Sequence, residues 1–188
     1  MAKQIGKYFL AIVPKGDIQE QATRMKLELK ENFNIKYALK SPSHVTLKMP
    51  FRWNEAKEEK LIDKLQIFFG DKEGFKLTFK GIGRFGRRVI YIRVEEQAQL
   101  IKMQSDLSTY CRHELKLVEE LSDKAYHPHM TVGFKDLKDQ HFDGCMKLLK
   151  DRGFFEVMDV QEVALLKKEG FSWTVVHMFG VNGEYSKN

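Results

Sequence analysis

Two short stretches of this chain repeat the pattern histidine, apolar residue, threonine, apolar residue, beginning at His44 and at His129. In a β-strand alternate side chains share a face, so His44 and Thr46 point to one face and the apolar residues to the other. His129 and Thr131 share a face in the same way. Each predicted strand therefore offers one face for chemistry and one face for a hydrophobic core.

Paired histidines and paired threonines are suited to the cleavage of a phosphodiester. Histidine exchanges protons near neutral pH, and two facing histidines can act as base toward the nucleophile and as acid toward the leaving group. The hydroxyls of Thr46 and Thr131 can donate hydrogen bonds to a non-bridging oxygen, where negative charge develops. No metal-ligand cluster accompanies the motifs in the sequence. The set favours a phosphodiester with a neighbouring 2′-hydroxyl, or a 2′,3′-cyclic phosphate.

The motifs need strands to position them, and the hydrophobic pattern predicts such strands. We expect strands at 8–13, 44–51, 75–79, 89–94, 127–134, 159–168 and 171–181, the last two joined as a hairpin, and helices at 17–32, 54–69, 96–114 and 138–151. Asp17 is the expected N-cap of the first helix. Residues 81–88 are expected to be an irregular strand end or loop, and 119–126 a polar loop.

The same order of elements occurs on each side of about residue 88: strand, helix, motif strand, helix, strands. Helices beside antiparallel sheets make this an α+β fold. We expect residues 1–188 to form one domain with two pseudo-symmetric lobes, approximately 1–88 and 89–188. Each lobe would hold an antiparallel sheet with helices on its outer face.

The motif contexts Pro-Ser-His-Val-Thr-Leu-Lys and Tyr-His-Pro-His-Met-Thr-Val resemble those of the two-histidine (2H) phosphoesterases. Within these, the bacterial 2′-5′ RNA ligase or RNA 2′,3′-cyclic phosphodiesterase branch is the most similar. The resemblance implies two lobes whose sheets line a central groove. It also implies action on 2′,3′-cyclic or 2′-5′ phosphodiester bonds without a metal or other cofactor, with RNA ligation as a possible reverse reaction.

The resemblance also implies roles for individual residues. His44 and His129 would be the acid–base pair, in an order that the sequence does not assign. Thr46 and Thr131 would contact the phosphate. Lys48 continues the His44 face and would supply a basic substrate contact.

Four more side chains are candidates for substrate binding. Arg84, in a stretch rich in arginine, could hold a phosphate, although a solvated loop fits equally. Phe85 and Tyr126 could stack on a base, with core packing as the alternative. His127 shares a strand face with His129. These two histidines could begin a metal site, but no Cys or carboxylate cluster joins them, so we expect a substrate contact and no metal.

Bulk properties agree with a globular protein that binds an anion. Hydrophobic residues make up 43% of the 188 residues and charged residues 31%, and the formal net charge is +6. A surface that is merely basic would have the same charge. Two cysteines without a Cys-x-x-Cys pattern predict a reducing, cytoplasmic setting. The apolar run 8–13 is too short to cross a membrane, so we expect no membrane association. We also expect the protein to be a monomer.

The sequence therefore predicts a metal-independent phosphodiesterase that acts on RNA ends or small nucleotides. A non-catalytic module that binds RNA or nucleotides is one alternative, against which the two intact motifs argue. A cyclic phosphodiesterase for a small-molecule cyclic phosphate is another. A long RNA would need a basic path that extends beyond the groove, whereas a small ligand would not.

Overall fold

The structure, a computed structural model, describes residues 4–181 and confirms the α+β class. Its strands are β1 (Ile5–Ile12), β2 (Val45–Asn54), β3 (Phe75–Phe85), β4 (Val89–Val94), β5 (His129–Phe134), β6 (Phe155–Val160), β7 (Glu162–Glu169) and β8 (Ser172–Gly180). Its helices are α1 (Gly16–Phe33), α2 (Glu58–Gly70), α3 (Ala98–His113), α4 (Leu121–Lys124) and α5 (Asp139–Arg152), with 3-10 turns η1 (Tyr37–Lys40) and η2 (Glu55–Lys57).

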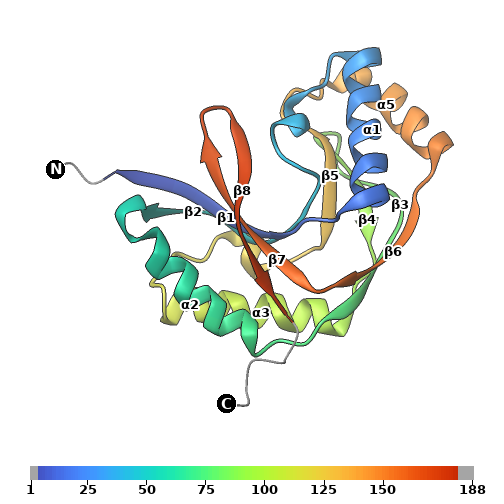
Figure 1. Cartoon of the computed structure of the whole chain (residues 1–188). Coiled ribbons are helices and arrows are strands. Elements are labelled where there is room, and N and C mark those ends of the chain that lie inside the picture. The colour runs from blue at the N-terminus through green and yellow to red at the C-terminus, as the bar shows by residue number, and fades with distance from the viewer. Residues whose placement is uncertain (1–3, 182–188) are drawn as a thin grey trace.

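The strands form a curled antiparallel sheet in the order β6-β3-β4-β5-β2-β1-β7-β8 (Figure 1). Four strands, β6-β3-β4-β5, make one half-sheet, and β2-β1-β7-β8 make the other. Neighbours within each half-sheet share long ladders, whereas β2 and β5 share the single pair Val45 and Met130. The two half-sheets therefore meet at the two histidine motifs.

The division of the sheet differs from the lobe boundary expected near residue 88. Residues 86–88 form the tight turn of the β3–β4 hairpin, so these two strands lie side by side in one half-sheet. Strands β7 and β8 return to lie beside β1 in the other half-sheet. The chain thus crosses between half-sheets after β2 and again after β6, so each half-sheet contains strands from both sides of residue 88.

The helices cover the outer side of each half-sheet (Figure 1). Helices α1 and α5 pack together over β5 and β3, and α2 and α3 lie against β8 and β2. Helix α1 follows β1 in the chain but packs on the half-sheet to which β1 does not belong. The expectation that Asp17 is the N-cap is wrong, because the N-cap is Lys15. Asp17 lies in the first turn, where a carboxylate stabilises the helix by its interaction with the helix dipole.

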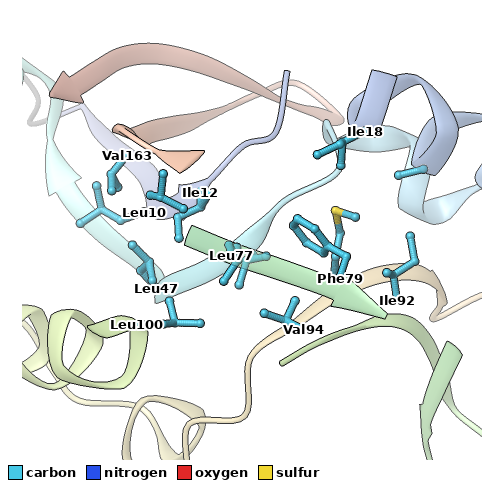
Figure 2. Packing of buried hydrophobic residues seen from close by; sticks show 14 of the residues in the cluster. Leu10, Ile12, Ile18, Leu47, Leu77, Phe79, Ile92, Val94, Leu100 and Val163 are labelled. Atoms are coloured by element: carbon cyan, nitrogen blue, oxygen red, sulfur yellow. The ribbon is translucent and has the colours of Figure 1, made fainter. Parts of the chain in front are cut away.

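The main core lies between the sheet and the helices and joins both half-sheets (Figure 2). Leu10 and Leu47 of one half-sheet share it with Leu77 and Ile92 of the other. Alternation along β1 sends Leu10 to this core and Phe9 to the opposite face. There Phe9 belongs to a smaller apolar cluster, so the face that carries the motif histidines has packing of its own.

Some element boundaries also differ from the prediction. The expected strand 159–168 is two strands, because the chain leaves the β3 edge at Gln161 and pairs β7 with β1. Residues 81–85 continue β3, and the expected loop 119–126 contains α4. Asn54 ends β2 rather than starting the helix, and its side chain caps η2 by accepting from the Ala56 amide at 3.2 Å. No helix within 4–181 has the length and apolar character to span a membrane.

Candidate active site

The pair Val45 and Met130 places both motifs at one point of the sheet. Both side chains are completely buried in the core. Because strand neighbours alternate between faces, the histidine and threonine of each motif project from the opposite, uncovered face. All four of these side chains are partly exposed.

The antiparallel register crosses the two motifs. Next to the buried pair, the antiparallel direction puts Thr46 on the side of His129, and these two residues line one cavity. The threonine of the first motif is thus a neighbour of the histidine of the second.

Both histidines make the same hydrogen bond to the backbone. The Nδ1 atom of His44 lies 2.7 Å from the carbonyl oxygen of Pro42, and Nδ1 of His129 lies 2.8 Å from that of His127. A carbonyl oxygen can only accept, so each Nδ1 carries the proton. In the neutral ring this leaves Nε2 free to accept a proton, which is the tautomer that a general base needs.

Burial favours the neutral form of both rings. Burial is the main cause that lowers the pKa of His44 to about 4; the hydrogen bond to the Pro42 carbonyl opposes it, and the positive charges of Lys26 and His129 contribute to the lowering. Burial likewise lowers the pKa of His129, while the hydrogen bond to the His127 carbonyl raises it and a positive charge on the His127 ring lowers it. A bound phosphate would bring negative charge and raise the pKa of the ring beside it.

Aromatic rings on the neighbouring strands support the two histidines. The ring of Phe9 on β1 lies 4.9 Å from His44, and that of Tyr91 on β4 lies 5.2 Å from His129. Phe85 packs edge-on against His129 at 4.9 Å and contacts Tyr91 at 4.5 Å with the two rings tilted by 36°. The histidine positions are therefore held by packing as well as by hydrogen bonds.

A mainly apolar cavity of about 250 Å³ opens beside His129. Its lining joins both motifs to the α4 segment: Thr46, Leu47, Met49, Phe85, Ser122, Asp123, Ala125, Tyr126, His127 and His129. Phe85 is 37% exposed, so part of its side chain is open to a ligand. The structure thus brings Phe85, Tyr126 and His127 together with His129, as a substrate pocket requires.

Tyr126 and His127 differ in how their polar atoms are satisfied. The hydroxyl of Tyr126 is buried without a hydrogen-bond partner in residues 4–181, and burial raises its pKa. Nε2 of His127 lies 3.4 Å from the Tyr91 hydroxyl, and its Nδ1 lies 3.7 Å from Glu96. Across the described part of the chain, no three His, Cys, Asp or Glu side chains are grouped as a metal site would require.

Comparison with known proteins gives the family. Residues 14–170, which are most of the chain, match the model of the 2′-5′ RNA ligase superfamily. This chain belongs to that superfamily, the 2H phosphoesterases. The resemblance drawn from the two motifs is therefore confirmed.

Relatives of similar length are named as phosphoesterases. A protein of Bacillus cereus strain G9842 named "Putative phosphoesterase" is 27% identical over 178 residues, which cover 92% of this chain and 95% of that protein. A Bacillus mycoides strain KBAB4 protein of the same description is 26% identical over 181 residues, covering 95% and 98%. The family and these relatives place the chain among phosphoesterases.

Solved structures show that the fold is shared. Escherichia coli LigT in its apo form superposes with a TM-score of 0.65 at 18% identity, covering 95% of this chain and 99% of LigT. TT0787 of Thermus thermophilus superposes with a TM-score of 0.63 at 18% identity, covering 95% and 100%. This chain therefore has the same fold as these two proteins.

The expected role of Lys48 in substrate contact is wrong, because a β-bulge interrupts the alternation of β2. Leu10 pairs with Lys48 and the next residue of β1 pairs with Thr46, so Leu47 is inserted between them. Lys48 is consequently only 1% exposed and forms an ion pair with Asp123. Its Nζ also donates to the Val118 carbonyl at 3.0 Å.

That ion pair connects the first motif strand to the α4 segment. The other carboxylate oxygen of Asp123 accepts from the Met49 amide at 3.0 Å, and the first accepts from the Glu120 amide at 3.0 Å. Ser122, Asp123 and Tyr126 line the cavity beside His129. Lys48 is therefore a positioning residue for the pocket wall rather than a substrate ligand.

Arg84 also lies away from the site. It precedes Phe85 on β3, so the two side chains must point to opposite faces of the sheet. Phe85 faces His129, whereas Arg84 extends toward Phe142 of α5 and donates to the Gly86 carbonyl at 3.2 Å. The expectation of a phosphate contact from Arg84 is therefore wrong.

Sequence reasoning missed Phe9, Tyr91 and Lys26 as members or neighbours of the site. Phe9 and Tyr91 are aromatic residues at the uncovered-face positions of β1 and β4, which alternation within those apolar runs could have indicated. Lys26 stands inside the apolar stripe of α1, between Met25 and Leu29. A lysine in a buried stripe is itself a signal, but only the packing of α1 brings it near His44.

Proposed function

We propose that this protein is a metal-independent phosphodiesterase that opens 2′,3′-cyclic phosphates, or cleaves 2′-5′ bonds, at RNA ends or in small nucleotides. The observation that carries the proposal is the mirrored pair of histidines. Each donates its Nδ1 proton to the carbonyl two residues earlier, and each projects from the same uncovered face at the join of the half-sheets.

Hydrolysis of a cyclic phosphate needs one proton removed and one supplied. One histidine Nε2 takes a proton from water as the oxygen attacks phosphorus. The other histidine, protonated beside the phosphate anion, gives its Nε2 proton to the ribose oxygen as the P–O bond breaks. The product is an open phosphomonoester with a free ribose hydroxyl. Each proton transfer contributes roughly 10²–10⁴-fold to the rate.

The threonines serve the non-bridging oxygens. Thr46 and Thr131 belong to the two strands that meet at this join, so a phosphate bound there would receive a hydroxyl hydrogen bond from each strand. Such donors stabilise charge that develops on phosphate oxygens, and they need no reorganisation during the reaction.

The cavity beside His129 suits the sugar and base of the substrate. It is mainly apolar, and Phe85 presents an aromatic face on which a base can stack. Escherichia coli LigT, which shares the fold, has been crystallised with 3′-AMP and with phosphate. These complexes support a nucleotide ligand for the site proposed here.

The decisive experiment incubates the protein with 2′,3′-cyclic nucleotides and with 2′-5′ and 3′-5′ dinucleotides, in EDTA, and identifies products by mass. We expect cyclic phosphates or 2′-5′ bonds to be hydrolysed in EDTA at the rate seen without it. Loss of activity in EDTA and recovery with a divalent ion would overturn the metal-free mechanism. Binding without turnover of any substrate would leave a nucleotide-binding module.

A further inference from the structure

Lys26 of α1 is a buried cation without a carboxylate partner. It is 3% exposed, and its Nζ donates to the Ser41 carbonyl at 3.1 Å. It makes no ion pair with any residue in 4–181. Buried lysines are rare in proteins unless they are paired, because a lone charge is poorly solvated in the interior. Burial accordingly lowers the pKa of Lys26 to about 8.

Lys26 lines a second cavity, of about 590 Å³, on the His44 side of the site. Pro42, whose carbonyl holds the His44 ring, also lines it. Trp173 of β8 lines this cavity too. The Phe9 ring lies between Trp173 and His44, with its centre 4.8 Å from the Trp173 ring and 4.9 Å from the His44 ring. The cavity beside His129 and this one therefore flank the histidine pair.

The walls of the His44-side cavity are basic. Lys15, Lys26 and Lys40 line it, and none of its lining residues in the described chain is Asp or Glu. The charge of Lys15 is already matched by an ion pair with Glu162. Nζ of Lys40 sits at the rim, 4.5 Å from the centre of the Tyr37 ring. Among the lysines that line this cavity, Lys26 is thus buried and has no acidic partner in the described chain.

We propose that the His44-side cavity is a second phosphate subsite, in which Lys26 binds a substrate phosphate next to the scissile one. The bound oxygen would be the counter-ion that the chain does not supply, in a charge-assisted hydrogen bond. Trp173 offers an aromatic wall for the adjoining nucleoside. The preferred substrate then carries at least two phosphates, so that both cavities are occupied. This inference rests on the function proposed above and narrows its substrate class.

Two kinds of substrate can supply that phosphate: an internucleotide phosphodiester, or a terminal phosphomonoester. The test therefore compares four compounds that end in the same 2′,3′-cyclic phosphate. They are adenosine 2′,3′-cyclic phosphate, its 5′-phosphorylated form, the adenosine dinucleotide, and that dinucleotide with an uncharged methylphosphonate linkage. We expect kcat/KM to be roughly tenfold or more higher for the charged dinucleotide than for the methylphosphonate. The 5′-phosphorylated compound shows whether a monoester also fills the subsite.

The variant Lys26→Met should bring the ratio of kcat/KM between charged and methylphosphonate dinucleotides close to one. Lys26→Gln keeps a donor for the Ser41 carbonyl but removes the charge, and should do the same. Lys30→Met, an exposed lysine of the same helix, is the matched control and should keep the wild-type ratio. A ratio unchanged in both Lys26 variants overturns the proposal. So does an equal loss for all four compounds, because that is the result of a purely structural lysine.

A binding measurement separates this inference from the proposed catalysis. The probes are deoxyadenosine dinucleotides with a 3′-phosphate, one with a charged linkage and one with methylphosphonate, titrated calorimetrically. If no compound is turned over, the proposed function fails, while a charge preference in Kd that depends on Lys26 still supports the subsite. Equal affinity for both probes in wild type refutes the subsite, whatever the activity.

Discussion

Thr46 and His129 belong to different motifs and different half-sheets, yet they line one cavity. Their neighbourhood follows from the single pair that joins β2 to β5. In the proposed mechanism, a substrate phosphate at this join would meet one histidine and one threonine from each half of the sheet. The site therefore exists only when both half-sheets are formed and joined, which makes the residues around the join the first to test.

Replacing either histidine by alanine should remove most turnover while substrate still binds. Proton transfer acts in the transition state, so we expect kcat to fall by roughly 10²–10⁴-fold with a smaller change in KM. The double variant should lose far less than the product of the single losses, because the two rings act as a unit. Steady-state kinetics on a cyclic nucleotide checks this. Near-wild-type turnover in either single variant would exclude that residue from catalysis.

The pH dependence should be bell-shaped and should shift when substrate binds. Burial lowers the pKa of both histidines below the ordinary 6.5. The free enzyme holds a protonated ring only in acid, so kcat/KM should be maximal below pH 6.5. Bound phosphate raises the pKa of the acid, which moves the kcat profile to higher pH. Both apparent pKa values belong to the coupled pair. A kcat/KM maximum above pH 8 would contradict the structure.

Removing the buried partner of Asp123 should destabilise the fold. Lys48→Met leaves the Asp123 carboxylate buried and unpaired, and breaking such a pair costs about 3–5 kcal/mol. Adding Asp123→Asn removes the charge and should recover part of that loss. Urea unfolding of both single variants and the double variant measures the coupling between the two side chains. Independent, additive effects would show that the ion pair does not hold the α4 segment in place.

Lys26→Met should stabilise the protein at neutral pH. The ordinary lysine pKa of 10.5 falls to about 8 in the fold, so below pH 8 the folded state carries the whole penalty of a buried charge. Between pH 8 and 10.5 the unfolded chain binds more protons, and wild-type stability rises with pH.

We expect a gain of roughly 1–3 kcal/mol at pH 7 in this variant, after the loss of the hydrogen bond to the Ser41 carbonyl, and a smaller gain toward pH 10.5. Denaturant unfolding at pH 7, 9 and 10 tests this. A variant less stable than wild type at pH 7 would mean that Lys26 is retained for folding rather than for binding.

Phe85→Ala should weaken binding of the base. Base stacking on an aromatic ring is worth about 1–3 kcal/mol, so KM for adenosine 2′,3′-cyclic phosphate should rise roughly fivefold or more. The same variant should change KM for ribose 2′,3′-cyclic phosphate, which lacks a base, much less. Phe155→Ala, an exposed phenylalanine on the edge strand β6, is the control. Equal effects on both compounds would remove Phe85 from base recognition.

The motif strands, the α+β class and the family could be predicted because they depend on local pattern. His44 and Thr46 share a face because strand alternation is set by the backbone. The apolar residue that follows each motif histidine, Val45 or Met130, belongs to the buried pair that joins the half-sheets. The same reasoning placed Phe85, Tyr126 and His127 among candidate contacts, and these three line the cavity beside His129.

Lys48 and Arg84 show where a local pattern stops being informative. The bulge at Leu47 turns Lys48 into the core, and nothing in the order of residues announces an insertion in strand pairing. The sequence of residues 81–88 predicts an irregular strand end or loop, from which Arg84 would be free to reach a phosphate. Because β3 continues through Phe85, strand alternation fixes the face to which each side chain points. The Arg84 side chain points away from the site, toward Phe142.

The amino-acid sequence by itself determined which side chains could perform acid–base chemistry and which face of each strand they would share. The tertiary structure alone decided what surrounds them. Helix α1 crosses to the half-sheet opposite its own strand, and this brings Lys26 to the cavity next to His44. Such neighbours depend on strand order and helix packing between distant segments. Periodicity reports only the burial of each segment, and not the partner that buries it.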